Sequence, residues 1–330
     1  MSEYGDDGLS MSSQYYLESE TSALIGAFQD IGFSVRPFYN EVDFIKWASN
    51  KNGQRDTSRW QLVVTTAEGG HGEGRRALIP SFCGLLGLPC WNSPAHGCSI
   101  ARHKFHANKL LAACGIRVPE IWSFSLQSGW LNGACPENGT KVILKPAWES
   151  GSKGVDDRSI AIVESGFDKL VLERATSFGQ PCVVQEFKTG YEVGAPIIGI
   201  PQTTAAGLIG FSDGNKERYG PRARTFDDEK ILKSAGNFVF NHVPQAQIER
   251  ALCEAERAFD LLSMKTLGRI DMRIDEDGNA WIFDTNESPP PLPRSSFVRL
   301  FESYGFAYND VLALMIGVNL LHHGQIDCPS

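Results

Sequence analysis

The stretch that decides the fold is residues 268–289, GRIDMRIDEDGNAWIFDTNESP. Two apolar runs flank an Asp-Gly dipeptide that is typical of a hairpin turn, so the stretch predicts two strands lying side by side. Side chains alternate between the faces of a strand, which puts Arg269 and Asp271 on one face of the first strand. Asp284 and Asn286 share a face of the second strand for the same reason. The hairpin can therefore bring four polar side chains to one place.

These side chains have the chemistry of a metal site. Mg²⁺ prefers oxygen ligands and commonly takes one or two carboxylates together with nucleotide phosphates. Asp271, Asp284 and Asn286 would supply two carboxylates and an amide beside the Arg269 guanidinium. The flanking residues 281–283 are strongly apolar, which is unusual around a surface charge. We interpret the hairpin as a magnesium–nucleotide site; the alternative is a pair of solvated acids at strand ends.

Two further stretches contain candidate nucleotide contacts. KVILKPAWESGSKGV (141–155) predicts a strand that delivers Lys145 to a Gly/Ser turn, where backbone N–H groups can bind an anion and the lysine a phosphate. The stretch lacks Walker A spacing, and a plain turn with a surface lysine is the alternative. PCVVQEFKTGYE (181–192) predicts a strand that ends at residues 185–188, with Glu192 after a glycine turn. Alone, this stretch indicates only a strand exit.

Composition limits the classes of protein. The chain has 330 residues, 42% of them hydrophobic, which is enough for a substantial core. With 31 Lys+Arg against 39 Asp+Glu, the net charge of −8 argues against a nucleic-acid partner. An uninterrupted run of about 18 apolar residues is lacking, so we expect no membrane span. The N-terminus lacks the apolar segment of a secretory signal, so we expect a cytoplasmic protein.

Helix and strand patterns indicate three units, residues 1–98, 99–190 and 191–330. From 18 to 92 helices alternate with strands, one of them at about 60–69, which predicts an α/β unit with a parallel sheet. We expect a single helix over 99–114, because a glycine and a proline follow it as stop signals. The two later units combine helices with small sheets, which predicts α+β folds.

Taken in this order, the three stretches resemble the ATP-grasp superfamily and specifically the D-alanine–D-alanine ligase family. The similarity extends from about His71 to Gly317. HGEG (71–74) is similar to a turn in that family's N-terminal domain, and residues 99–119 are similar to a helix that brings a lysine, here Lys104, to the nucleotide. The hairpin matches nearly position for position. The resemblance implies a three-domain ATP-grasp fold in which two α+β units sandwich ATP.

The resemblance also implies a role for each site residue, with ATP and two Mg²⁺ ions, replaceable by Mn²⁺, as cofactors. ATP contacts are implied for Lys104, Lys145, Gln185, Glu186, Phe187, Lys188, Glu192, Lys230 and Phe283. Metal ligation is implied for Asp271, Asp284 and Asn286, catalysis for Arg269 and Ser152, and substrate binding for His71, Ser288, Ser295 and Ser296. The Gly/Ser turn would close over the phosphates as a lid.

The sequence departs from the family's pattern, mainly on the substrate side. Asp284 stands where a glutamate is usual, and Pro290 stands where a glycine would offer a backbone N–H. The turn reads S-G-S-K-G in place of G-S-S-x-G, so only Ser152 keeps a hydroxyl. We find no match to the family's opening strand and its G-G-x-S-x-E turn. Glu18 or Glu20 could bind the substrate's ammonium group instead, or they are solvated first-turn acids favoured by the helix dipole.

These features predict an ATP-dependent carboxylate–amine ligase. A carboxylate would be activated as an acyl phosphate and then joined to an amine, forming an amide between small substrates of amino-acid type. Because the substrate-binding elements depart from the family, we expect a role in specialised metabolism. Housekeeping D-alanine–D-alanine ligation is one alternative, and an ATP-binding regulatory protein without ligation is another. The expected partners are small molecules, and a homodimer is usual for the relatives.

Overall fold

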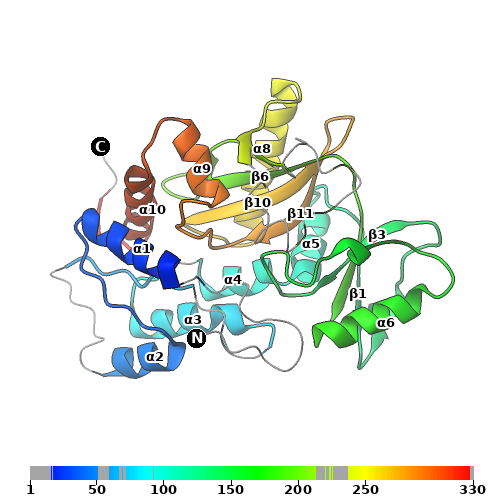
Figure 1. Cartoon of the computed structure of the whole chain (residues 1–330), viewed down its shortest axis with the longest axis horizontal. Coiled ribbons are helices and arrows are strands. Elements are labelled where there is room, and N and C mark those ends of the chain that lie inside the picture. The colour runs from blue at the N-terminus through cyan, green and yellow to red at the C-terminus, as the bar shows by residue number, and fades with distance from the viewer. Residues whose placement is uncertain are drawn as a thin grey trace.

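Two antiparallel sheets form the centre of the molecule, and helices surround them (Figure 1). The computed structural model describes residues 16, 18–50, 59–66, 69, 72–91, 93–212, 220, 223, 225 and 237–327. The larger sheet has six strands in the order β11-β10-β6-β8-β9, with β7 paired to β6. These strands are β6 (Tyr191–Ile198), β7 (Thr204–Ala205), β8 (Ile209–Phe211), β9 (Asn237–Val239), β10 (Leu267–Ile274) and β11 (Ala280–Asn286).

The smaller sheet has five strands in the order β2-β1-β5-β3-β4. These strands are β1 (Ile121–Ser125), β2 (Gly129–Trp130), β3 (Lys141–Pro146), β4 (Ile160–Ile162) and β5 (Cys182–Glu186). On one face, Val142 and Leu144 of β3 pack with Val171 of helix α6 (Phe167–Phe178). Side chains alternate along a strand, so Lys145 and Gln185 lie on the opposite face of the sheet.

The predicted hairpin at 268–289 is confirmed as β10 and β11. Ile270, Met272 and Ile274 of β10 enter a core cluster that includes residues of α5 and α8. Arg269 and the other polar residues of β10 alternate with these three and therefore point from the opposite face. The larger sheet thus separates an apolar core on one side from a polar surface on the other.

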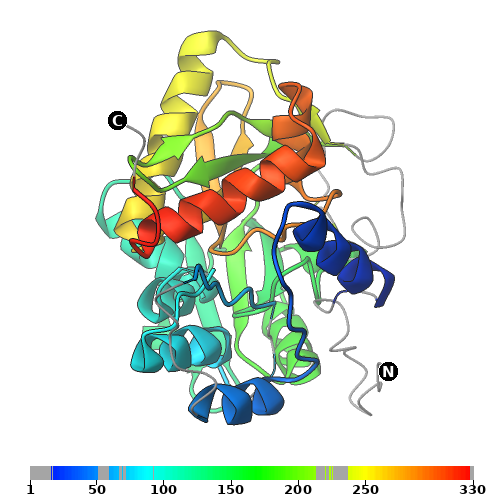
Figure 2. The same cartoon turned by 90° about the vertical axis from the view of Figure 1, so that its left-hand side faces the viewer.

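The helices cover the outer faces of the sheets. Their bounds are α1 (Glu18–Asp30), α2 (Glu41–Ser49), α3 (Leu78–Leu86), α4 (Ala95–Arg102), α5 (Lys104–Ala113), α8 (Gln245–Leu261), α9 (Ser296–Ser303) and α10 (Tyr308–His322), with the short 3₁₀ helix η3 (Arg75–Ala77) before α3. In Figure 2, α10 runs across the larger sheet and α1 lies beside α10. Leu24 and Phe28 of α1, Phe297 of α9 and Met315 of α10 share one buried cluster with Leu267 of β10.

The first unit differs from its predicted architecture. In the described residues, the parallel sheet expected there is reduced to a single parallel bridge between Val63 and Cys90. Pro89 lacks an N–H, so it cannot donate to a ladder. On its other side, Cys90 is bonded to His323, whose Nε2 lies 3.1 Å from the Cys90 nitrogen and 2.9 Å from its carbonyl oxygen. One edge of this short segment thus carries a single bridge among the described residues, and the other edge contacts a side chain.

The prediction of one helix over 99–114 is wrong, because the chain breaks between α4 and α5 at His103. His103 has an extended backbone, and its ring nitrogen accepts a hydrogen bond from the His106 N–H at 3.4 Å. The Lys104 N–H leaves the helical pattern and donates to the Ala147 carbonyl at 3.0 Å. Burial lowers the pKa of His103 to about 4, so this cap stays uncharged at neutral pH. The break makes Lys104 the first residue of a helix.

Within the described ranges, no single helix is long and apolar enough to cross a membrane. One consecutive pair, α9 and α10, reaches the required length and composition only when its members are added together. That pair is bent by 118° at the junction.

Candidate functional site

A cleft lies between the polar faces of the two sheets. Strands β3 and β5 contribute one side, and β6, β10 and β11 the other. Most of the residues that the sequence singled out line this cleft: Lys104, Lys145, Ser152, Gln185, Glu186, Phe187, Lys188, Glu192, Arg269, Asp271, Phe283, Asp284 and Asn286. The fold thus brings together groups that are up to 182 positions apart in the sequence, Lys104 to Asn286.

One side of the cleft, which we call the hairpin wall, consists of the cleft-lining residues of β10 and β11: Arg269, Asp271, Arg273, Trp281, Phe283, Asp284 and Asn286. Arg269 lies opposite Asn286 in the ladder, and Asp271 lies opposite Asp284. A register shift after Asp271 adds one residue to β11, so that Phe283 and Asp284 both line the cleft. The bulge therefore brings an aromatic ring and a carboxylate to the same side of one strand.

Asp271 is the centre of the hairpin wall. Its two oxygens accept hydrogen bonds from Arg269, at 2.6 Å from Nε and 2.8 Å from Nη2. Asn286 adds a third at 2.9 Å. A bidentate arginine–carboxylate pair is among the strongest polar contacts in proteins and sets the orientation of both groups. These contacts fix the guanidinium of Arg269 next to Asp271, which Asn286 also contacts.

The donor set of the hairpin wall fits Mg²⁺ in kind, since Asp271, Asp284 and Asn286 supply only hard oxygen ligands. Asp284 is the more accessible carboxylate, with 26% of its side chain exposed. In the part of the chain that is described, no group of three or more His, Cys, Asp and Glu residues could hold a metal ion. An ion here would thus depend on one amide and on phosphate oxygens as further ligands.

The opposite side, which we call the turn wall, consists of Lys104, Lys145, Gln185 and the turn 149–154. Lys145 is buried, and its Nζ donates to the Gln185 side-chain oxygen at 3.1 Å. Nζ also lies 4.7 Å from the centre of the Phe283 ring. Burial lowers the pKa of Lys145 to about 8, partly offset by the charge of Asp284. A phosphate bound beside this ammonium group would stabilise its charge in place of the water that burial removes.

Lys104 connects the turn wall to the hairpin wall. The break at His103 places Lys104 at the start of α5, where its side chain is buried. Its Nζ donates to the Glu149 carbonyl and lies 3.9 Å from an oxygen of Asp284. The predicted site lysine therefore faces both the turn and the candidate metal ligands.

At the far end of the cleft, two acids are joined to cations. Glu186 forms an ion pair with Lys188, whose Nζ lies 4.1 Å from the centre of the Trp281 ring. Glu192 forms a buried ion pair of 2.7 Å with Arg273. Arg273 was not singled out in the sequence, although alternation along β10 puts it on the same face as Arg269. The alternation of side chains along this strand is the signal from which Arg273 could have been predicted.

The turn 149–154 has the backbone geometry of an anion-binding loop. Gly151, Ser152 and Gly154 have positive φ values of 60°, 53° and 76°. Their N–H groups donate to no backbone carbonyl among the described residues, whereas the N–H of Lys153 donates to Ser150. Free N–H groups in a turn of this kind form a concave site for anions. A side chain at Gly154 would lie 3.0 Å from Phe178, so this turn packs tightly on α6.

Glu149 begins this turn and was missed in the sequence analysis. Only 7% of its side chain is exposed. Its carboxylate accepts two contacts of 2.9 Å from Arg75 of η3 and one of 2.8 Å from Gln180. Burial alone would raise the pKa of Glu149, but Arg75 and Gln180 hold it below its usual range. The partner Arg75 lies 74 positions away, so no local pattern could have revealed the pair.

The three serines predicted to bind substrate, Ser288, Ser295 and Ser296, are not among the residues that line the cleft. Ser295 caps α9 by accepting a hydrogen bond from the Val298 N–H. Ser296 is buried and accepts a hydrogen bond from Arg269 Nη1 at 2.9 Å. Ser288 is partly buried beyond the end of β11. Of the two serines left open by the sequence, Ser296 is therefore the one that contacts a cleft residue.

Four further residues were considered in the sequence: His71, Lys230, Glu18 and Glu20. His71 and Lys230 lie outside the described residues, so their predicted roles remain predictions. Glu20 of α1 forms an ion pair of 2.6 Å with Arg294, whereas Glu18 is exposed at the start of that helix.

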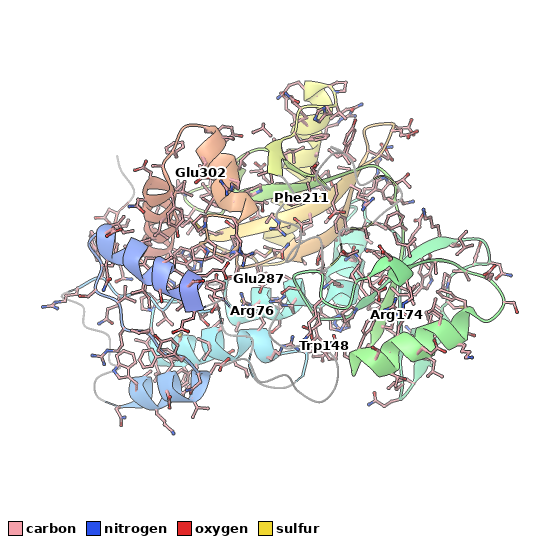
Figure 3. All side chains as sticks on the ribbon, in the orientation of Figure 1. Arg76, Trp148, Arg174, Phe211, Glu287 and Glu302 are labelled. Carbon is pink, nitrogen blue, oxygen red and sulfur yellow. The ribbon has the colours of Figure 1, made fainter. Side chains whose placement is uncertain are left out.

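A buried charge cluster joins the first unit to the end of the hairpin wall. Glu287 directly follows Asn286 and is 3% exposed. Its carboxylate lies 2.8 Å from Arg76 Nε and 3.6 Å from Arg102 Nη2, and Figure 3 shows Glu287 and Arg76 close together. The two arginines outweigh burial and hold the pKa of Glu287 below its usual range. The sequence analysis also missed this cluster, because Arg76 comes from η3, Arg102 from α4 and Glu287 from the residue that follows β11.

The chain is similar to several known proteins in sequence and in structure. A D-alanine–D-alanine ligase of Gluconobacter oxydans is 28% identical over 251 residues, which cover 74% of this chain and 77% of that protein. One of Geobacillus thermodenitrificans is 23% identical over 291 residues, which cover 84% and 75%. The structure of D-alanine–D-alanine ligase from Bacillus anthracis complexed with ATP aligns with a TM-score of 0.71 at 18% identity, covering 97% and 96% of the two chains.

VanG D-Ala:D-Ser ligase from Enterococcus faecalis aligns with a TM-score of 0.62 at 19% identity, covering 79% of this chain and 73% of that one. At these identities the structural likenesses establish the fold, which is therefore shared over nearly the whole chain. A family model described as D-ala D-ala ligase C-terminus matches residues 110–317, well over half of the chain and both walls of the cleft except Lys104. The chain therefore belongs to the D-alanine–D-alanine ligase family of ATP-grasp ligases.

Proposed function

We propose that this protein joins a small carboxylate to a small amine, both of amino-acid type, in an ATP-dependent reaction that forms an amide. One observation carries the proposal. The buried cations of the turn wall face, across a single cleft, a hairpin wall that combines a fixed guanidinium with oxygen ligands for a metal. A phosphate-binding side and an acyl-activating side in one cleft are what carboxylate activation by ATP requires.

In the first step, an oxygen of the substrate carboxylate attacks the γ-phosphorus of ATP, ADP leaves, and an acyl phosphate forms. Lys104 and Lys145 would bind the phosphates, and residues 185–188 would contact the nucleoside. Asp271, Asp284 and Asn286 would hold Mg²⁺, which supplies positive charge at the transferring phosphoryl group. The burial of the lysines excludes water from their ammonium groups, and this strengthens their attraction for phosphate.

In the second step, the amine attacks the acyl carbon, a tetrahedral oxyanion forms, and inorganic phosphate leaves. Arg269 would stabilise that oxyanion, because its side chain is oriented by Asp271 and Ser296 at the cleft. Pro290 cannot add a backbone N–H to this site. Arg269 would therefore carry more of the oxyanion stabilisation here than in a protein with glycine at that position.

The test is turnover on pooled substrates. The protein is incubated with Mg-ATP and pools of D- and L-amino acids and hydroxy acids, and phosphate release and product masses are measured. We expect phosphate release that depends on one pool and a product mass equal to the two substrates less water. Binding of ATP without turnover on any pool would contradict ligation and favour a regulatory protein.

A second candidate is ligation of D-alanine to D-alanine, which the names of the relatives favour. The same assay with D-alanine alone decides between the two. D-alanyl-D-alanine as the principal product would support the second candidate and exclude a role restricted to other amino-acid pairs.

A further inference from the structure

Lys153 is a cation of the cleft to which the sequence analysis assigned no role. It lies in the middle of the turn 149–154, lines the cleft, and has 12% of its side chain exposed. Burying an ammonium without a close partner is unfavourable, since the charge loses its water. The position therefore calls for a negatively charged partner.

The other cations that line the cleft each have a close hydrogen-bond acceptor in the protein. Lys188 forms an ion pair with Glu186, and the two arginines form ion pairs of 2.6 and 2.7 Å. Lys104 donates to the Glu149 carbonyl, and Lys145 donates to Gln185. Within the described ranges, no group accepts a hydrogen bond from Nζ of Lys153, and its nearest carboxylate oxygen, on Glu149, is 3.8 Å away.

That carboxylate is already engaged. Arg75 approaches both Glu149 oxygens at 2.9 Å, and Gln180 donates to one of them at 2.8 Å. The charges of Arg75 and Glu149 offset each other. The positive charge of Lys153 can therefore attract an anion in the cleft. Lys153 also sits between Ser152 and Gly154, whose free N–H groups suit an anion.

We propose that Lys153 is a further phosphate-binding residue of the ATP site, and that Arg75 is a positioning residue that holds Glu149 away from it. This inference rests on the proposed function, because it needs ATP in the cleft. On binding, the Lys153 ammonium would leave its long contact with Glu149 and donate to a phosphate oxygen. Arg75 and Gln180 would keep Glu149, and with it the start of the turn, in place.

Nucleotide affinity tests Lys153 without requiring turnover. Dissociation constants for ATP and AMP are measured by calorimetry with Mg²⁺ for the wild type, Lys153→Met, Lys153→Gln and Lys153→Arg. The control is Lys169→Met, which removes the same charge from the exposed side of α6. Unfolding temperatures establish that each variant is folded.

We expect the Met and Gln variants to bind ATP roughly tenfold more weakly, as for the loss of one charge-assisted hydrogen bond. AMP affinity should stay unchanged, since AMP lacks the outer phosphates. The Arg variant and the Lys169 control should bind ATP within about threefold of the wild type. Wild-type ATP affinity in the folded Met and Gln variants would overturn the role of Lys153. Failure of the wild type to bind ATP would instead overturn the proposed function.

Arg75 is tested by a rescue. In Arg75→Met, Glu149 loses its partner and can pair with Lys153, so ATP binding should weaken several-fold while AMP binding does not change. Adding Glu149→Gln to that variant removes the competing charge and should restore most of the ATP affinity. A purely structural role for Arg75 predicts the opposite, because Glu149→Gln also weakens the remaining contact of position 149 with Gln180. A double variant that binds ATP more weakly than the single one would overturn the positioning role.

Discussion

The two walls of the cleft are built by different means. In the hairpin wall, Arg269, Asp271 and Asn286 contact one another within one hairpin, although Arg269 also contacts Ser296 of α9 and Arg273 contacts Glu192 of β6. In the turn wall, Glu149 is held by Arg75 from η3, and Gly154 packs on α6. The centre of the hairpin wall is therefore formed by three residues of a single hairpin. The turn wall depends on several units of the chain being in place.

The largest expected effect tests the hairpin wall. Arg269→Ala should lower the rate of substrate-dependent phosphate release by about 10²–10³, as for the loss of one oxyanion donor. ATP affinity should change by less than about threefold, since Arg269 is assigned to the acyl-transfer step and not to a nucleotide contact. Stopped-assay phosphate release and calorimetric ATP binding measure the two quantities. Near-wild-type phosphate release would remove Arg269 from the chemistry, and a parallel loss of ATP affinity would contradict the separation of the walls.

The next prediction concerns the packing of the turn wall. Gly154→Ala should destabilise the fold by about 2–4 kcal/mol, because a Cβ there meets Phe178 at 3.0 Å and φ is +76°. Gly139→Ala is the matched control, since φ is +85° but nothing lies within 4 Å of the added Cβ. The control should lose only the backbone part, about 1–2 kcal/mol. Urea unfolding measures both, and equal losses would show that packing on α6 adds nothing.

The smallest effect is a pH dependence of the turn wall. Burial lowers the pKa of Lys145 to about 8, and a bound phosphate would raise it again. ATP affinity should therefore be constant below pH 8 and fall above it, by at most about tenfold per pH unit. Calorimetry at pH 7, 8 and 9 and constant ionic strength measures the slope. Lys145→Arg stays charged over this range, so its slope should be flat; an equal slope in both proteins would exclude Lys145 as the titrating group.

The contrast between the walls also explains what could be predicted from the sequence. The two strands, the turn between them and the gathering of Arg269, Asp271 and Asn286 were predicted, because alternation and an Asp-Gly turn are local signals. In the turn wall, Lys104 was found only through the resemblance, whereas Lys145 was proposed from its strand and the Gly/Ser turn, with a surface lysine as the alternative. Glu149 was quoted but not singled out, since its partner comes from a distant helix.

Other misses have equally physical reasons. The break at His103 is accompanied by a hydrogen bond from the Lys104 N–H to the carbonyl of Ala147, which lies 43 positions further along the chain, whereas the local pattern around 99–114 is helical throughout. The parallel sheet expected in the first unit was inferred from one apolar run at 60–69. A strand needs neighbours, and the described residues supply a single bridge at Val63. Local sequence patterns therefore predicted most individual helices and strands, but not the contacts between segments that are far apart in the sequence.

The buried Glu287 has a consequence for the construction of chimeric enzymes. It comes from the end of β11, whereas Arg76 and Arg102 come from segments before residue 110, where the family match begins. An exchange of the segment before that point for one without both arginines would leave a carboxylate buried without its counter-charges, at a loss of about 3–5 kcal/mol. A recombination of this ligase with a relative therefore has to move positions 76, 102 and 287 as one set.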